Sequence, residues 1–444
     1  MKFINKIFST TFLLFSLFLL TYTFYKSEIF WNGEKSNYYF TYYIVSIILI
    51  ITSIITFFLN QKIKEYLIIS LISITFGLYF FESYLVLNKE FTNHQLDKMK
   101  IYQKEKDKKY DTRSPYQIYN DLKKIDENIT VSVSPNNYFN KNINIFPLSG
   151  ISNSKTIHCN ENGHYSIYES DRYGFNNPDI EWDKKDIEYL LVGDSFTHGA
   201  CVNRPYDIAS VLRLVSNKSV LNLGYSANGP LMYYATLREY LDTNVKNILW
   251  IFYEGNDLLD LQNELKVQIL KNYLQDLSFA QNLKFRQNEI NNLSKKLIEE
   301  KKKISIYNYR NFLKLDKTRT KLNYLLPKKF KPKNDLQEYS QKIPEIEFRK
   351  ILELTKNLTI KNNSNLYFVY LPEYMHYKPD YKNTNYILVK KIVEELKIPF
   401  IDIHKEVFTN SENPLNFFPF GLNGHYNING YKKVAESIYI NTLK

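Results

Sequence analysis

The chain has 444 residues, more than one average domain, and 44% of them are hydrophobic, so a full-sized core can be buried. Only 13 glycines and 14 prolines occur, which argues against long disordered tracts. The formal net charge is +12, but no nucleic-acid-binding motif accompanies it. We therefore expect anionic lipid headgroups, and not nucleic acid, as the partner of the basic residues.

Three apolar stretches open the chain, at about Ile7–Tyr25, Tyr38–Leu59 and Tyr66–Leu87. Each has about the 20 residues that a helix needs to cross a bilayer, and Tyr, Trp and Phe gather near their ends. The flank TYTFYKSE after the first stretch offers no small-residue cleavage site, which favours an uncleaved anchor over a secretory signal. Residues 1–87 are therefore predicted to form a three-helix transmembrane anchor in the inner (cytoplasmic) membrane.

Charged residues around the first stretch bear on the orientation of this anchor. Lys2 and Lys6 precede it, which favours a cytoplasmic N-terminus and, after three crossings, an extracytoplasmic C-terminal part. Lysines also follow the third stretch, so the count of basic residues does not decide by itself. The two cysteines, Cys159 and Cys201, favour the extracytoplasmic side, because a single disulfide between them suits an oxidising compartment.

A zinc site is the alternative use of these cysteines, with His158 and His164 as further ligands. The spacing of the four residues is poor for a tetrahedral site. We therefore expect a disulfide between Cys159 and Cys201 and no metal ion.

Two segments of different character separate the anchor from the regular part of the chain. Residues 88–110 are polar and strongly charged, and we expect a stalk that leads away from the membrane. Residues 111–186 carry turn signals such as Ser134-Pro135 and Asn177-Pro178, and we expect an irregular lead-in.

From residue 187 onward, short apolar runs alternate with helical patterns. The runs are predicted strands at Ile187–Gly193, Ser219–Gly224, Lys246–Tyr253, Leu366–Leu371 and Pro399–Ile403. The helical patterns are at Tyr206–Val215, Pro230–Leu241 and about Asn429–Leu443. This alternation predicts an α/β domain over residues 187–444, with a parallel sheet covered by helices on both faces and reacting groups at the carboxyl ends of the strands.

A charge-rich helical segment interrupts this alternation at about residues 260–343, as in QNEINNLSKKLIEEKKK. We interpret this insert as a solvated helical arm. A cap over the site or a docking surface for a partner is the alternative.

Four residues with useful chemistry follow predicted strands or precede a predicted helix. Ser195, in LVGDSFTHG, stands on the turn after the first strand, where a base can reach its hydroxyl. Gly224 and Asn256 follow the second and third strands and can offer N–H donors to an oxyanion. His425, before the last helix, is a natural base for a serine hydroxyl at neutral pH.

Each of these residues also has an ordinary structural use. A strand-end glycine such as Gly224 commonly makes a turn, Asn256 can cap the following helix, and a single histidine is more often a surface residue. Their fixed order, and their places at the ends of strands, make the joint pattern more specific than any one of them.

In this order of residues the chain resembles the SGNH (GDSL-like) hydrolases, named after Ser, Gly, Asn and His, over about residues 171–444. The resemblance implies a flavodoxin-like three-layer α/β/α sandwich. It implies Ser195 as nucleophile, His425 as base, and the amides of Ser195, Gly224 and Asn256 as the oxyanion hole. The stretch SDRYGFNNPDIEW also resembles the lead-in of membrane-anchored bacterial members from polysaccharide gene clusters.

Two positions depart from the family pattern. Glu254 stands where the family usually has glycine, two residues before the asparagine. More importantly, Leu422 stands where the family has the Asp that orients the histidine, three residues before it. Asp402 or Asn423 could orient the histidine instead, as could Glu412 or a backbone carbonyl.

The resemblance implies a serine esterase that needs no cofactor and removes small acyl groups, chiefly acetyl, from envelope glycans or lipids. An O-acyltransferase is one alternative, and it would need a membrane partner that supplies the acyl group, since three helices are too few to form that channel. A non-catalytic glycan-binding or assembly protein on the same fold is another, which Leu422 favours and the intact Ser195 and His425 oppose.

Overall fold

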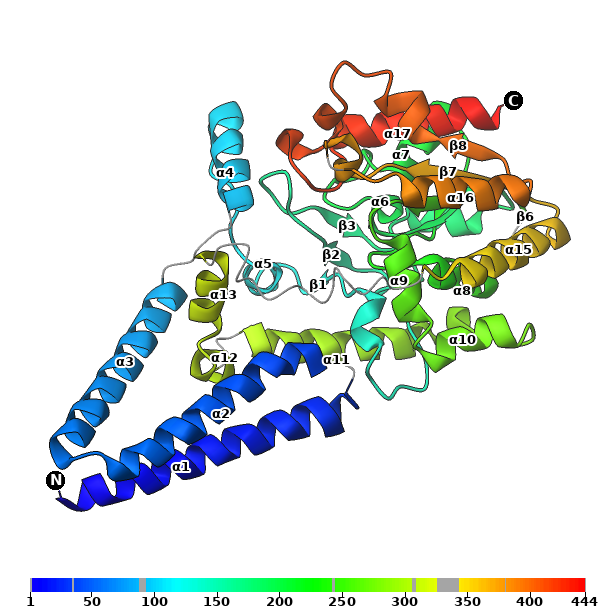
Figure 1. The fold of residues 1–444 in the computed structure, drawn as a ribbon. Coiled ribbons are helices and arrows are strands. Elements are labelled where there is room, and N and C mark those ends of the chain that lie inside the picture. The colour runs from blue at the N-terminus through cyan, green and yellow to red at the C-terminus, as the bar shows by residue number, and fades with distance from the viewer. Residues whose placement is uncertain are drawn as a thin grey trace. The chain divides into compact units, whose positions relative to one another are not determined.

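The computed structural model describes residues 2–33, 36–87, 93–241, 244–305, 309–325, 343–379 and 381–443 (Figure 1). These residues form two compact units. The first unit falls within residues 1–90 and 307–341, and the second within residues 91–306 and 342–444.

The first unit is built on three long apolar helices, α1 (Lys2–Phe24), α2 (Ser36–Phe58) and α3 (Gln61–Leu87). The spans that are long and apolar enough to cross a membrane are Ile7–Phe30, Tyr38–Phe58 and Gln61–Leu87. Many of their large apolar side chains are exposed, as expected of helices whose surroundings are lipid. Three helices could therefore cross a membrane, at the places that the sequence predicts.

The predicted insert is divided between the two units. In the first unit, α12 (Tyr309–Leu313) and α13 (Asp316–Leu325) pack with α3. The Glu82 carboxylate on α3 accepts hydrogen bonds from the N–H groups of Lys317 and Thr318, at 3.0 and 2.7 Å. Because the first amides of a helix have no partner within it, Glu82 supplies the cap of α13.

The remaining described part of the insert is buried in the second unit. Its helices are α9 (Asp257–Glu264), α10 (Gln268–Gln275) and α11 (Gln287–Ser305). Tyr273 on α10 and Ile290 on α11 are fully buried in the main core. The interpretation as a solvated arm is therefore wrong for α9, α10 and α11, because each of these helices buries one face in the main core.

The second unit contains a five-stranded parallel sheet in the order β5-β4-β6-β7-β8. The strands are β4 (Asp186–Gly193), β5 (Val220–Asn222), β6 (Asn244–Tyr253), β7 (Asn365–Leu371) and β8 (Phe400–Asp402). Numbered along the chain, this is the doubly wound order 2-1-3-4-5, whose binding crevice lies where the strand order reverses, at the carboxyl ends of β4 and β6. Ser195 follows β4 and Asn256 follows β6.

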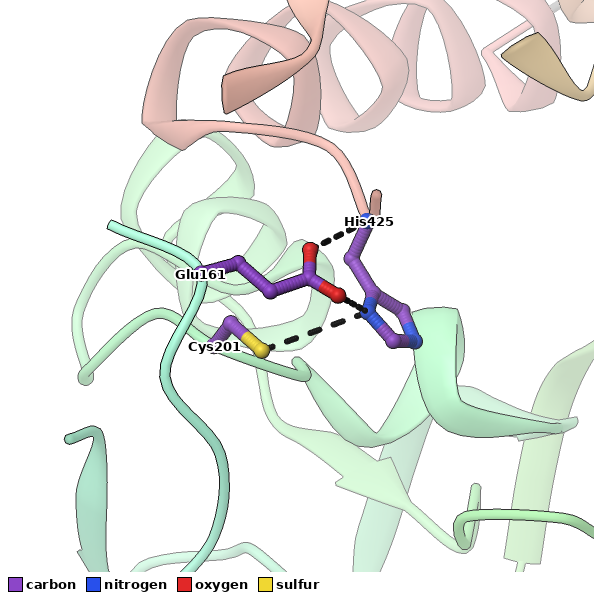
Figure 2. Close-up of side chains that lie close together, drawn as sticks. All are labelled: Glu161, Cys201 and His425. Atoms are coloured by element: carbon purple, nitrogen blue, oxygen red, sulfur yellow. Dashed lines mark hydrogen bonds and ion pairs between the residues drawn. The ribbon is translucent and has the colours of Figure 1, made fainter. Parts of the chain in front are cut away.

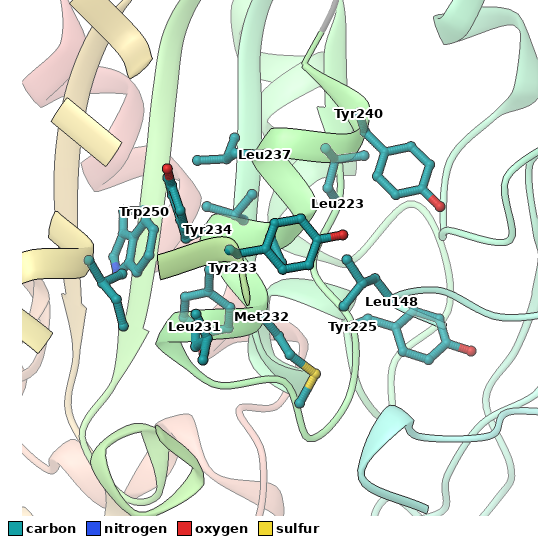
Figure 3. Packing of buried hydrophobic residues seen from close by; sticks show 14 of the residues in the cluster. Leu148, Leu223, Tyr225, Leu231, Met232, Tyr233, Tyr234, Leu237, Tyr240 and Trp250 are labelled. Atoms are coloured by element: carbon teal, nitrogen blue, oxygen red, sulfur yellow. The ribbon is translucent and has the colours of Figure 1, made fainter. Parts of the chain in front are cut away.

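Helices cover both faces of this sheet, as predicted for a three-layer sandwich (Figure 1). They are α6 (Ser195–His198), α7 (Ile208–Ser216), α8 (Pro230–Tyr240), α15 (Glu345–Lys361), α16 (Thr384–Glu395) and α17 (Ile428–Thr442). The alternation of side chains along β6 sends Trp250 and Phe252 to the face under α8 and α15, and Leu249 and Ile251 to the face under α7 and α17. Figure 3 shows the first of these faces, where tyrosines and leucines of α8 lie near Trp250.

The predicted irregular lead-in contains a small second sheet in the order β1-β2-β3. Its strands are β1 (Ile129–Val131), β2 (Lys155–Ile157) and β3 (Ile167–Glu169), and α5 (Pro115–Leu122) packs on it. The loop between β2 and β3 contains Cys159 and Glu161. This part of the chain therefore has a core of its own, which carries a loop toward the main sheet.

Asp171 organises the stretch that follows β3. Its buried carboxylate accepts hydrogen bonds from the N–H groups of Tyr173 and Phe175, from the Asn177 amide and from the Trp182 indole. Asn177 in turn donates to the backbone carbonyl of Asn222 at the end of β5. The stretch that resembles the family lead-in thus stabilises the end of β5, the edge strand beside β4.

The described part of the predicted stalk contains a helix with two buried side chains. Its helix α4 (Asn93–Lys106) buries Lys98 and Tyr102, which are 6% and 8% exposed. The ring of Tyr102 lies edge-on to Tyr110 and Phe420, with centroids 5.7 and 6.2 Å apart. Residues 93–106 therefore belong to the second unit and pack on it through Lys98 and Tyr102.

Candidate active site

Ser195 lies on a tight turn between β4 and α6. β4 ends at Gly193, where an added Cβ would lie 1.9 Å from Thr197 Oγ1 and 2.9 Å from the carbonyl oxygen of Ile251. Glycine is needed there because the helix returns so close to the strand. Asp194 caps α6 through its side chain, and this turn leaves Ser195 half-buried at the carboxyl end of the strand.

His425 reaches Ser195 from the loop before α17, across 230 positions of sequence. Its Nε2 lies 2.9 Å from Ser195 Oγ. The loop is fixed on both sides, because Tyr426 donates its buried hydroxyl to the carbonyl of Pro372 and Asn427 caps α17. The contact that the sequence predicts between these two side chains is therefore present in the structure.

Ser195 Oγ also lies 3.3 Å from the Asp194 carboxylate. The shorter distance to His425 favours the histidine as the acceptor of the hydroxyl proton. Burial raises the pKa of Asp194 to about 6, so this carboxyl group is a poor competitor in acidic solution.

Glu161 orients His425 through two contacts (Figure 2). Its Oε1 lies 3.1 Å from His425 Nδ1, and its Oε2 accepts a hydrogen bond from the backbone N–H of His425 at 2.6 Å. With its Nδ1 protonated, the imidazole presents an unprotonated Nε2 to Ser195. Ser195, His425 and Glu161 thus form a relay of hydroxyl, imidazole and carboxylate.

The relay perturbs both of its titrating partners. Burial alone would lower the pKa of His425, but the charge of Glu161 and its hydrogen bond more than offset burial, so this pKa is raised. Burial would raise the pKa of Glu161, but the interactions with His425 and Lys98 hold it far below its usual value, at about 2. The carboxylate is therefore ionised throughout the neutral range.

The residues expected to orient His425 do not do so, and that prediction is corrected. The Asp402 carboxylate accepts hydrogen bonds from the Tyr386 hydroxyl at 2.6 Å and from the Lys405 N–H at 3.2 Å. Neither Asp402 nor Asn423 has a described hydrogen bond to His425. The acid comes instead from the lead-in, which no spacing rule along the sequence would identify.

The cysteine pair is one sequence signal that could have led to Glu161. The structure joins Cys159 and Cys201 in a disulfide, with Cα atoms 4.9 Å apart, and Asn162 donates to the carbonyl of Cys201 at 2.9 Å. Cys201 lies six positions after the nucleophile and Cys159 two before the acid. A disulfide between the two loops therefore brings an acidic residue of the lead-in next to Ser195.

This disulfide also bears on metal binding. Glu161, Cys201 and His425 have potential ligand atoms within 4.8 Å of one another (Figure 2). The Cys201 sulfur is bonded to Cys159 and cannot act as a thiolate ligand. The same bond removes both thiolates from the alternative zinc site with His158 and His164.

The side chain of Asn256 and the amide of Gly224, both predicted as oxyanion donors, differ in their hydrogen bonds. The Asn256 side chain donates one N–H to Asp260 at 2.5 Å, and no described residue accepts its second N–H. The amide of Gly224 donates to the side-chain oxygen of Asn222 at 2.9 Å and so already has a partner in this structure. The prediction of the Gly224 amide as an oxyanion donor is therefore corrected. Glycine has a structural reason at this position, because a Cβ would lie 2.5 Å from Thr197.

Two histidines near the site share a partner that the sequence does not predict. His158 and His198 both lie within hydrogen-bonding distance of the Ser226 hydroxyl, at 2.8 and 3.1 Å. Burial lowers the pKa of both imidazoles, that of His158 to about 3, so both are neutral. They support the loop that follows Gly224.

Glu254, the first departure from the family pattern, is an anchor for the loop after β7. Its carboxylate accepts hydrogen bonds from the Glu373 N–H and the Tyr381 hydroxyl, and it pairs with His376 Nδ1 at 2.8 Å. It has no described contact with Ser195 or His425.

No family model matches the chain, and no curated protein matches it either. Solved structures do match. One is a member of the lipolytic G-D-S-L family from Veillonella parvula, with 11% identity over 57% of this chain and 97% of that chain and a TM-score of 0.31. Another is the acetyl xylan esterase AlAXEase, with 12% identity over 57% and 98% of the two chains and a TM-score of 0.31.

A variant of an acetyl-xylooligosaccharide esterase from Geobacillus is a third match, with 13% identity over 58% of this chain and 96% of that chain and a TM-score of 0.29. At such identities and TM-scores, these likenesses carry no information about substrate or mechanism. The chemistry has to be inferred from the side chains of the site itself.

Proposed function

We propose that this chain is a membrane-anchored, serine-dependent ester hydrolase. The observation that carries the proposal is the relay itself, with Ser195 Oγ 2.9 Å from His425 Nε2 and His425 Nδ1 3.1 Å from Glu161. A serine hydroxyl becomes a competent nucleophile when an adjacent base accepts its proton and a third group fixes that base. All three groups lie at the carboxyl end of the sheet.

The reaction runs in two steps. In the first, His425 takes the Ser195 proton as Oγ adds to the ester carbonyl, and Glu161 balances the charge of the imidazolium. The donors proposed for the oxyanion are the Ser195 amide and the second N–H of the Asn256 side chain. The ester C–O bond then breaks, His425 returns the proton to the leaving alcohol, and the acyl group stays on Ser195.

In the second step, water takes the place of the alcohol. His425 removes a proton from the water as it adds to the acyl carbon, and the bond to Ser195 breaks with return of that proton to Oγ. An acid and the unchanged enzyme result, with no further reactant. A sugar hydroxyl in place of water would make the same site an acyltransferase.

The sequence resemblance favours small acyl groups, chiefly acetyl, on envelope glycans or lipids as substrates. Three helices long enough to span a bilayer support membrane attachment. The disulfide supports the extracytoplasmic side of the inner membrane, where thiols are readily oxidised.

Labelling with a fluorophosphonate probe tests the proposal on the full-length protein in detergent. We expect labelling of the wild type, its loss in Ser195→Ala, and its retention in Ser219→Ala. Ser219 is a suitable control because its hydroxyl donates to the Asp186 carbonyl at the opposite end of the sheet. Acetate release from acetylated envelope polymers would then identify the substrate.

A well-folded wild type that the probe does not label would refute the esterase proposal. Labelling that survives Ser195→Ala would assign the nucleophile to another residue.

A further inference from the structure

A lysine that is not one of the three relay residues is buried beside them. Lys98 on α4 is 6% exposed, whereas Lys100 on the same helix is exposed. A buried ammonium group costs free energy unless nearby negative charge compensates it. Its position therefore calls for an explanation in terms of what it faces.

Tyr102 holds α4 against the two loops that carry the relay. An added Cβ on Gly163, two residues after Glu161, would lie 2.2 Å from the ring of Tyr102. On its other side, the same ring lies edge-on to Phe420, five residues before His425. The helix is thus packed between the loop of the acid and the loop of the base.

Gly424 shows how closely the charged groups converge. A Cβ at this position, next to His425, would lie 2.3 Å from Glu161 Oε2 and 3.1 Å from Lys98 Nζ. The Glu161 carboxylate and the Lys98 ammonium group therefore both lie next to the α-carbon of Gly424. Lys98 has no described ion pair closer than 4.0 Å, so it acts on Glu161 as a nearby charge and not as a direct partner.

Lys98 also lines a cavity of about 320 Å³. The side chains that share this cavity include those of His94, Tyr110, Glu161, Tyr165 and Asn423. Glu161 thus lines this cavity and at the same time binds His425 through both carboxylate oxygens.

We infer that Lys98 is a positioning residue of the relay, whose charge beside the Glu161 carboxylate limits how strongly Glu161 makes His425 a base. The inference rests on the proposed function, because the relay is its object. It gives the helix that follows the membrane anchor a direct part in the chemistry.

The sign of the electrostatic effect follows from the charges around His425. The groups that face it are Glu161, Asp194, Lys98, His158 and His198. Burial and the positive charge of Lys98 lower the pKa of His425, whereas Glu161 and Asp194 raise it. Loss of Lys98 leaves the carboxylates unopposed, so the pKa of His425 rises and less neutral imidazole is present at a given pH.

The test compares Lys98→Met, Lys98→Arg and the control Lys100→Met in the full-length protein in detergent. NMR titration of the His425 imidazole, assigned by its disappearance in His425→Gln, reports the base whether or not the protein is active. We expect the His425 midpoint to move to higher pH in Lys98→Met and to stay near the wild-type value in the other two variants. Lys98→Gln, with its neutral polar side chain, should repeat the shift if Lys98→Met folds poorly.

The rate of fluorophosphonate labelling against pH is the second readout. We expect the acid limb of this profile to move to higher pH in Lys98→Met, in parallel with the NMR midpoint. Loss of a merely structural residue would not cause this parallel shift. An unchanged midpoint in a folded Lys98→Met protein would overturn the inference while leaving the proposed function intact. Absence of wild-type labelling would instead count against the proposed function, and the NMR titration would still decide the role of Lys98.

Discussion

The substitution Glu161→Gln removes one charge and keeps the shape of the side chain. In the wild type, one carboxylate oxygen faces the backbone N–H of His425 at 2.6 Å and the other faces Nδ1 at 3.1 Å. The backbone N–H is always a donor, so the glutamine must turn its oxygen toward it. Its NH₂ group then faces Nδ1 and stabilises the imidazole tautomer that carries its proton on Nε2.

That tautomer cannot accept the Ser195 proton. The equivalent exchange of acid for amide in serine proteases lowers kcat by about 10⁴, which corresponds to about 5.5 kcal/mol of transition-state stabilisation. We expect a loss of similar size in kcat/KM for a chromogenic acetyl ester, with little change in thermal stability. Glu161→Ala should lose less, because the histidine is then free to adopt either tautomer.

The pH dependence supplies an independent check. Since Glu161 holds the pKa of His425 above the value that burial alone would give, its removal should move the acid limb of kcat/KM to lower pH. Asp402→Asn is the matched control and should retain activity, because Asp402 pairs with Tyr386. Activity of Glu161→Gln within about tenfold of wild type would refute the assignment of Glu161 as the orienting acid.

Two further predictions concern the surroundings of the relay. The double variant of Cys159→Ser and Cys201→Ser should lose about 4 kcal/mol of stability in chemical denaturation, from the chain entropy of a loop of 42 residues, and should approach the activity of Glu161→Ala. Full activity in the folded double variant would show that the disulfide does not position the acid. Glu254→Ala should lower the melting temperature, because it leaves the buried His376 without its partner, yet it should keep fluorophosphonate labelling. Loss of labelling in a folded Glu254→Ala protein would place Glu254 in the catalytic machinery.

The sheet could be predicted because its signals are local. Parallel strands buried on both faces read as short apolar runs, and each predicted run coincides with a strand of the structure. Ser195 could be identified because it follows the first predicted strand, and His425 because it precedes the last predicted helix. Their contact then follows from the order of the strands and the place of the last helix.

Glu161 could not be predicted in this way, because its partner is 264 positions away and its loop belongs to a separate small sheet. Asp402 appeared suitable because it ends a strand, but the hydroxyl of Tyr386 satisfies it. The packing of α4 was missed for a different reason. Its sequence is mostly polar and charged, and only two of its described side chains, those of Lys98 and Tyr102, are fully buried.

Glu161 binds both the ring and the main chain of His425, and this has a consequence for how the loop of His425 can open. A carboxylate that held only the imidazole would let the loop drift while the side chain stayed in place. Because Glu161 binds both the ring and the backbone N–H, the ring can rotate and the backbone can move only when both hydrogen bonds break together. Opening of this loop should thus be a concerted event, in which hydrogen exchange of the His425 amide and loss of nucleophile activation share one free energy.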